Sequence, residues 1–214
     1  RFTADDIRYC ADIAEARTIL FSEDFIDRID KIKTNLKGMK DFLFCGPKDL
    51  TPSYAQHWDD LLKGASTAEP KTPISLLDEA ALYFTSGTTG QPKPILLTHR
   101  NLEHACIVEN RHHNQTHKDN FICIPPLYHT GAKMHWFGNF IVGAKGVLLK
   151  GVKPEWIIQA ISEEQGTIMF LLVPWAQDIL VAIENGQIKL KDYRLDQWRL
   201  MHIGAQPVPP ALIK

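Results

Sequence analysis

The run of residues 167–173 is apolar on both of its alternating faces, and it constrains the fold more than any other part of the chain. A strand of this kind is buried on both sides, as in a parallel sheet that helices cover on both faces. Along the second part of the chain, helix-like segments alternate with short apolar runs, as βαβ units require. The sequence therefore predicts the α/β class, with largely parallel sheets covered by helices.

Hydrophobic periodicity and helix-end signals predict where the elements lie. Strands are expected at 18–21, 41–45, 80–85, 94–98, 121–124, 146–150, 167–173 and 198–203. Helices are expected at 4–16, 25–36, 58–62, 99–112, 131–142, 154–165 and 175–185, the first opened by a capping box of Thr3 and Asp6. The intervening segment 64–78, rich in Ser, Thr, Ala, Pro and Lys, is a possible subdomain boundary.

Composition excludes several classes of function. Lys and Arg number 24 against 25 Asp and Glu, so the net charge of −1 argues against an extended nucleic-acid surface. No apolar run approaches the ~18 residues of a membrane span, and no leader sequence opens the chain. The four cysteines form no CxxC pair and are expected to be reduced core residues of a cytoplasmic protein.

Residues 85–93, Thr-Ser-Gly-Thr-Thr-Gly-Gln-Pro-Lys, lie between two apolar runs and concentrate phosphate-seeking donors. Glycines leave backbone N–H groups open to an anion, because no side chain blocks the approach. Ser86, Thr88 and Thr89 add hydroxyl donors, and Lys93 adds a mobile positive charge. The pattern favours a nucleotide-phosphate loop over a hairpin turn that binds no ligand, since ordinary hairpin turns need only about two to five residues.

A Walker A loop is excluded by the prolines. That motif needs Gly-Lys-Ser/Thr at the opening of a helix. Here Pro92 replaces the glycine and Pro94 replaces the hydroxyl residue, and prolines on both sides of Lys93 disfavour a helix.

The string Tyr83–Lys93 resembles the signature loop of the adenylate-forming superfamily, which includes acyl- and aryl-CoA ligases and the adenylation domains of peptide synthetases. Thr98-His99 and Asn101-Leu102 match the continuation of that motif, and Pro94 departs from its usual glycine. The resemblance implies a fragment of the multi-layer αβαβα large domain of these enzymes. It also implies nucleotide binding by Thr85, Ser86, Gly87, Thr88, Thr89, Gly90 and Lys93.

Two further stretches are similar to family motifs that border the acyl pocket. Residues 125–131 resemble Pro-Leu-Phe/Tyr-His-x-x-Gly with one residue fewer, and residues 202–208 resemble the Gly-Gly-x-Pro-Leu turn. The implied pocket residues are Tyr128, His129, Gly131, Gly204, Ala205, Gln206 and Pro207, with His129 as a candidate catalytic residue. Lys150 ends an expected strand, where some CoA ligases have a basic residue near the CoA phosphates. The alternative is that it only caps the strand end.

The resemblance implies an ATP-dependent, AMP-forming acyl-CoA ligase that uses Mg²⁺, CoA and a carboxylic acid, fatty or aryl. Alternatives are an adenylation domain that loads a carrier protein, a kinase-like NTPase, and a non-catalytic fragment with a vestigial loop. Residues 1–214 are expected to be a partial N-terminal domain that is inactive alone, since no Tyr-Gly-x-Thr-Glu motif and no C-terminal domain follow. The pattern leaves the oligomeric state open.

Histidines gather between residues 99 and 135, so a metal site must be weighed against a polar surface. His112, His113 and His117 lie near an expected helix end, and no cysteine stands at zinc spacing from them. The charged stretch 109–118 is interpreted as a solvated helix face, and no metal site is predicted there.

Overall fold

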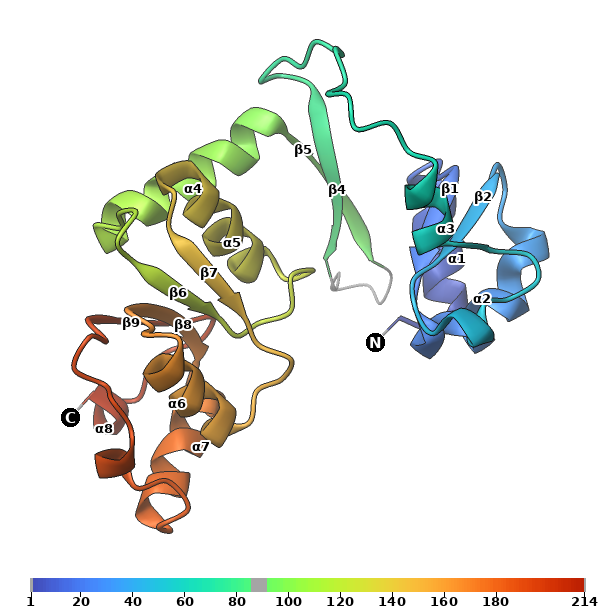
Figure 1. Ribbon diagram of the computed structural model, residues 1–214. Helices are drawn as coiled ribbons and strands as arrows, with labels where there is room; N and C mark the ends of the chain where they lie inside the picture. The colour runs from blue at the N-terminus through green and yellow to red at the C-terminus, as the bar shows by residue number, and fades with distance from the viewer. Residues whose placement is uncertain (1, 86–91, 214) are drawn as a thin grey trace. The chain divides into compact units, whose positions relative to one another are not determined.

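The chain divides between His99 and Arg100 into two units, each described here by itself. The computed structural model describes residues 2–85 and 92–213 (Figure 1). Segment 64–78 contains neither helix nor strand and is exposed throughout, and a subdomain boundary there stays a prediction. Within the described residues, no helix combines the length and the apolar character needed to cross a membrane.

The first unit opens with a small parallel sheet in the order β1-β2-β3, formed by Thr18–Phe21, Asp41–Phe44 and Gln56–His57. Its α-helices are α1 (Ala4–Ile13), α2 (Ile26–Ile32) and α3 (Trp58–Lys63), with 3₁₀ turns at Glu23–Phe25, Lys33–Asn35 and Lys48–Leu50. The buried apolar cluster that this sheet and its helices share consists of Phe21, Ile29, Ile32, Leu36 and Phe44.

In this unit the sequence predicted where helices begin better than where they end. The capping box is confirmed, because Thr3 Oγ1 accepts the Asp6 N–H and Asp6 accepts the Thr3 N–H. Helix α1 stops at Ile13 rather than 16, since Glu15 takes a left-handed backbone with φ of 48°. The single helix expected at 25–36 is shorter, because 3₁₀ turns replace its two ends.

A two-stranded antiparallel hairpin completes the first unit. Strand β4 (Glu79–Thr85) pairs with β5 (Lys93–Thr98), in agreement with the strands expected at 80–85 and 94–98. The register places Thr85 opposite Lys93. The residues between these ends, 86–91, lie outside the described part of the chain.

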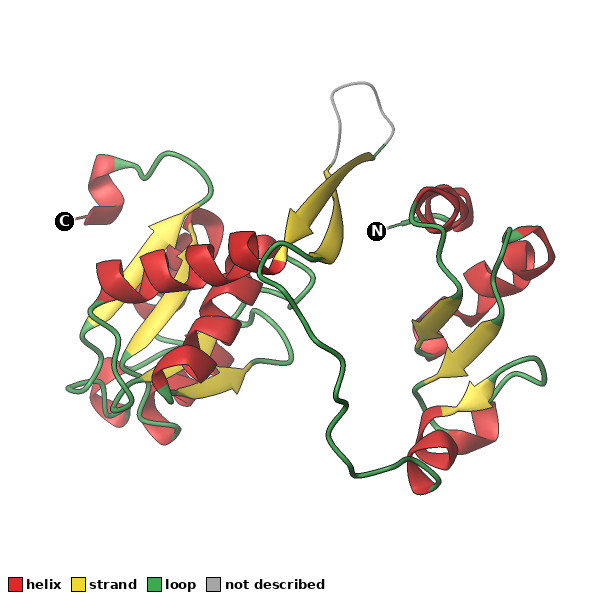
Figure 2. Ribbon diagram, turned by 90° about the horizontal axis from the view of Figure 1, so that it is seen from above, coloured by secondary structure: helices red, strands yellow, loops and turns green. Residues whose placement is uncertain are grey.

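The second unit is a parallel sheet of order β7-β6-β8-β9 with helices on both faces (Figures 1 and 2). Its strands are β6 (Asn120–Cys123), β7 (Lys145–Leu148), β8 (Ile168–Leu172) and β9 (Leu200–Gly204). Its helices are α4 (His99–His113), α5 (Thr130–Val142), α6 (Pro154–Glu163), α7 (Val173–Glu184) and α8 (Pro210–Ile213), with a 3₁₀ turn at Leu190–Asp192.

Alternate residues of β6 and β8 face opposite helix layers, which confirms the two-sided burial predicted for 167–173. On one face, Ile122, Met169 and Leu171 belong to a cluster with the apolar residues of α6 and α7. On the other face, Phe121, Cys123, Ile168 and Phe170 cluster with Ala132 of α5. Full burial of such side chains contributes about 1.5–3 kcal/mol each, so these two clusters hold the unit together.

The cysteines only partly match their expected core positions. Cys10, Cys106 and Cys123 are buried, whereas Cys45 is exposed, and all four are free thiols. Cys45 follows β2 directly, where the chain leaves the sheet for an exposed turn.

An ion pair between the exposed Arg199 and the buried Asp119 ties the end of α4 to the start of β9. Arg199 donates through Nε to Asp119 Oδ1 at 2.9 Å and through Nη2 to Oδ2 at 3.0 Å, and its Nη1 donates to the His113 carbonyl at 2.9 Å. Thr167 Oγ1 also donates to Asp119 Oδ1, at 2.8 Å. Burial alone would raise the pKa of Asp119, but the bonds from Arg199, the Thr116 backbone and Thr167 lower it to about 2.

We expect Asp119→Asn to destabilise the chain by on the order of 2 kcal/mol at pH 7. Because the folded-state pKa of Asp119 is depressed, this stability is complete above about pH 4 and is lost as the pH falls toward 2. The difference in free energy of unfolding between wild type and Asp119→Asn, measured by urea unfolding, should therefore shrink by about half at pH 3. The exposed Asp196→Asn is the control, and a difference that stays constant with pH would contradict the assignment.

Candidate functional site

The hairpin β4–β5 holds the two described ends of the expected phosphate loop. Thr85 ends β4 and Lys93 begins β5, and both side chains are exposed. Their pairing brings the ends of the loop together at one end of an antiparallel ribbon. Ser86, Gly87, Thr88, Thr89 and Gly90, the rest of the predicted nucleotide-binding set, lie outside the described residues.

The segment after β6 carries the aromatic–histidine pair. Tyr128 is 82% exposed, and His129 is the N-cap of α5, where its Nδ1 accepts the Gly131 N–H at 3.3 Å. An N-cap side chain satisfies a backbone donor of the first turn that has no partner within the helix. The structure therefore gives His129 a local role that the sequence motif did not predict.

The turn after β9 carries the second predicted pocket segment. Gly204 ends the strand, and Ala205 has a φ of 71°, the left-handed region that a side chain rarely adopts. Ala205, Gln206 and Pro207 are exposed. A strained non-glycine residue at a strand end is typical of functional turns.

Phe170 of β8 brings these two segments together. A Cβ atom built on Gly131 would lie 3.3 Å from Phe170 Cε1, and one on Gly204 would lie 3.4 Å from Phe170 Cε2. The two glycines thus lie against opposite edges of one ring, at the carboxyl ends of parallel strands. Ligands of open α/β sheets bind outside this edge.

Lys150 lies at the same edge, because it follows the carboxyl end of β7 by two residues and is exposed. The described structure thus gathers residues 128–131, 204–207 and Lys150 along one side of the second unit's sheet. Their roles in substrate binding stay predictions.

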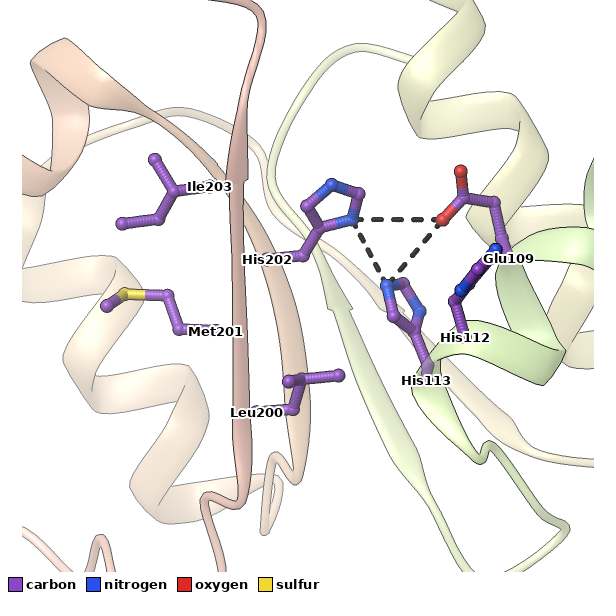
Figure 3. A pocket seen from close by; sticks show the side chains of 7 residues that line it. All are labelled: Glu109, His112, His113, Leu200, Met201, His202 and Ile203. Carbon is purple, nitrogen blue, oxygen red and sulfur yellow. Dashed lines mark hydrogen bonds and ion pairs between the residues drawn. The ribbon is translucent and has the colours of Figure 1, made fainter. Parts of the chain in front are cut away.

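A pocket of about 480 Å³ opens beside β9 and the last turn of α4. Figure 3 shows three of its side chains converging: His113 Nε2 lies 3.1 Å from His202 Nδ1 and 3.6 Å from Glu109 Oε2. The distance from His202 Nδ1 to Glu109 Oε2 is 3.8 Å. The other residues that line the pocket are His112, Leu200, Met201 and Ile203.

Buried aromatic rings hold the histidines of this face. His135 of α5 stacks on Phe121 with ring centroids 4.7 Å apart, and His202 lies edge-on to Phe170 at 5.0 Å. Burial, reinforced by repulsion from the neighbouring histidines and, for His113, from Arg199, lowers the pKa of His113 to about 4 and that of His135 to about 3. Both rings are therefore neutral at physiological pH. Within the described part of the chain, Nδ1 of each ring is buried without a hydrogen-bond partner.

The expectation of a solvated face over 109–118 is wrong for part of that stretch. His113 is only 6% exposed, and Asn110 and Gln115 are also buried, whereas His112 and His117 are exposed as expected. The physical reason is that the end of α4 packs on α5, where Asn110 Nδ2 donates to the Gly138 carbonyl at 2.9 Å.

The convergence with His202 could not be found from local spacing, because 89 residues separate it from His113. The signal that the sequence did offer is the i, i+4 spacing of Glu109 and His113, which places both side chains on one face of a helix.

Comparison with known proteins identifies the chain's relatives. The family model described as AMP-binding enzyme matches residues 1–214. A medium-chain fatty-acid–CoA ligase of Escherichia coli K12 is 32% identical over 116 residues, covering 54% of this chain and 20% of the relative. An acyl-CoA ligase, sidI, of Beauveria bassiana is 29% identical and covers 100% of this chain and 38% of the relative.

Solved structures share the fold over the whole chain. The long-chain-fatty-acid–CoA ligase FadD1 of Archaeoglobus fulgidus superposes with a TM-score of 0.86 at 19% identity, covering 99% of this chain and 41% of that one. The N-terminal domain of FACL13 from Mycobacterium tuberculosis gives 0.84 at 19% identity, covering 100% and 50%. The chain spans only 20% to 38% of the length of the two curated relatives above.

The capping role of His129 can be separated from a role in substrate binding. We expect His129→Ala to lower stability by about 0.5–1 kcal/mol, and His129→Asn to leave it unchanged, because Asn is a strong N-cap. If the imidazole also contacts a carboxylate substrate, both variants lower kcat/KM for that substrate in the whole protein. The exposed His117→Asn serves as control, and wild-type kinetics in His129→Asn would limit His129 to capping.

Proposed function

This chain belongs to the AMP-binding enzyme family, and on that premise we propose that the whole protein is an ATP-dependent, AMP-forming acyl-CoA ligase. The observation that carries the proposal is that several relatives are named for the formation of CoA thioesters. They are a medium-chain fatty-acid–CoA ligase, a 2-succinylbenzoate–CoA ligase and a feruloyl-CoA synthase. The acyl substrate of this protein is proposed only as a fatty or aryl carboxylic acid.

The proposed reaction has two steps. In the first, a carboxylate oxygen attacks the α-phosphorus of ATP, the bond from that phosphorus to the bridging oxygen breaks, and pyrophosphate leaves. In the second, the sulfur of CoA attacks the acyl carbon of the acyl-adenylate, giving a thioester and AMP, and the thiol proton is released. Charge develops on phosphate oxygens in the first step, so positioned donors are the main contribution that this chain can make.

The loop that joins β4 to β5 would hold the β- and γ-phosphates of ATP. Lys93 supplies a positive charge from the first position of β5, and Thr85 supplies a hydroxyl from the last position of β4. Neither is a carboxylate of the kind that holds Mg²⁺ in proteins, so Mg²⁺ would enter bound to the triphosphate.

The acyl group would lie along the carboxyl edge of the sheet in the second unit. The approach of Gly131 and Gly204 to the ring of Phe170 supports this placement, because it brings the two predicted pocket segments to one ring at this edge. Lys150 at the same edge is proposed to contact a CoA phosphate, and its exposure leaves the ammonium group accessible. The four free thiols favour a reducing compartment, and we propose the cytoplasm.

The function is tested on the whole protein with ATP, Mg²⁺ and a panel of carboxylates from acetate to long fatty acids and aryl acids. We expect carboxylate-dependent release of pyrophosphate, followed by an acyl-CoA thioester detected by mass spectrometry when CoA is present. A thioester that forms only on a phosphopantetheinyl carrier protein would replace CoA as the acceptor. Absence of carboxylate-dependent pyrophosphate release would refute the adenylation step itself.

Lys93→Ala removes a charged phosphate donor from the loop. A hydrogen bond to a charged group contributes about 1.5–3 kcal/mol, so we expect kcat/KM for ATP to fall roughly 10- to 150-fold. Steady-state kinetics with varied ATP measure the change. Lys71→Ala, in the exposed segment 64–78, is the matched control, and unchanged ATP kinetics in folded Lys93→Ala would remove the phosphate role.

A further inference from the structure

We infer that Glu109, His113 and His202 form a binding site for a divalent metal ion of the zinc type, which the proposed ligase reaction does not use. The three side chains come from the last turns of α4 and from β9, within one unit. Each presents one ligand atom, and the three atoms lie within 4.8 Å of one another.

The separations of the ligand atoms match the geometry of a small metal ion. With metal–ligand bonds of ~2.0–2.1 Å, two ligands of a tetrahedral ion lie about 3.3 Å apart. The three observed separations are 3.1, 3.6 and 3.8 Å, so shifts of about half an ångström would complete the triangle.

Hydrogen bonding among the three side chains does not pair all three of their ligand atoms. One N–H can bridge His113 Nε2 and His202 Nδ1 at 3.1 Å, because one nitrogen donates and the other accepts. Glu109 Oε2 is then at 3.6 and 3.8 Å from the two nitrogens, beyond hydrogen-bond distance from both. A single cation would bind all three atoms at once, whereas one proton can be hydrogen-bonded between only two of them at these distances.

The surrounding structure preorganises the site. His113 is buried, and its imidazole packs against the rings of Phe121 and His135. Arg199 donates to the His113 carbonyl, and Asp119 neutralises the charge of that guanidinium. Glu109 and His202 are 23% and 34% exposed, so an ion can enter from the pocket.

The ligand set selects the class of ion. Two imidazoles and one carboxylate suit Zn²⁺ and its transition-metal neighbours, whereas Mg²⁺ prefers oxygen ligands alone. Three protein ligands and an open pocket leave a fourth position for water. Because His113 Nδ1 has no acceptor among the described residues, we expect weaker affinity than in sites where a second shell orients each histidine.

The experiment titrates Zn²⁺ and Co²⁺ into whole protein stripped with a chelator, without ATP. We expect one equivalent to bind in calorimetry, a visible Co²⁺ absorption band typical of tetrahedral nitrogen and oxygen ligands, and no displacement by excess Mg²⁺. Glu109→Gln and His202→Asn, whose side chains are partly exposed and of similar size, should each weaken binding at least tenfold.

Matched controls separate this site from other metal-binding groups. His112 lines the same pocket but is not one of the three proposed ligands, and His117 is exposed elsewhere. The variants His112→Asn and His117→Asn should therefore bind Zn²⁺ as the wild type does. Absence of saturable Zn²⁺ binding, binding unaffected by Glu109→Gln and His202→Asn, or equal loss in the two controls would overturn the inference. A thiolate charge-transfer band with Co²⁺ would also overturn it, by assigning the ion to cysteine.

Discussion

The second unit depends on the burial of β6 and β8 from both sides. Their alternate side chains enter two separate apolar clusters, one under α6 and α7 and the other under α5. The strands of this sheet pair in parallel, and the crossover connections that parallel pairing requires place helices on both faces. A parallel sheet brings the carboxyl ends of all its strands to one edge, and that edge carries every pocket residue predicted in this unit.

Phe170 illustrates how the core and the candidate site share the same atoms. The residue belongs to a buried cluster of β8, yet its ring borders Gly131 after β6, Gly204 at the end of β9 and the imidazole of His202. A Cβ atom at Gly131 would crowd the ring, and one at Gly204 would lie in van der Waals contact with it. The packing constraint of the core therefore also shapes the surface where a carboxylic acid is proposed to bind.

The sequence predicted strands and helix starts well, since these depend on local patterns. The capping box at Thr3, the strands of the hairpin and the two-sided strand β8 are confirmed. Helix ends were predicted less well, because 3₁₀ turns and a left-handed Glu15 replaced regular turns. The solvated face expected at 109–118 was wrong in part, since the packing of α4 on α5 buries Asn110, His113 and Gln115 and no local pattern reports that contact.

The sequence by itself determined the α/β class, the family resemblance and the two strands that end at Thr85 and begin at Lys93. These follow from residue types at fixed short spacings, where backbone geometry is nearly independent of the rest of the chain. Only the tertiary structure decided that His202 meets Glu109 and His113, and that one ring separates Gly131 from Gly204. Such contacts join residues that are tens of positions apart. Their distances are set by sheet order and helix packing, which a short sequence window does not contain.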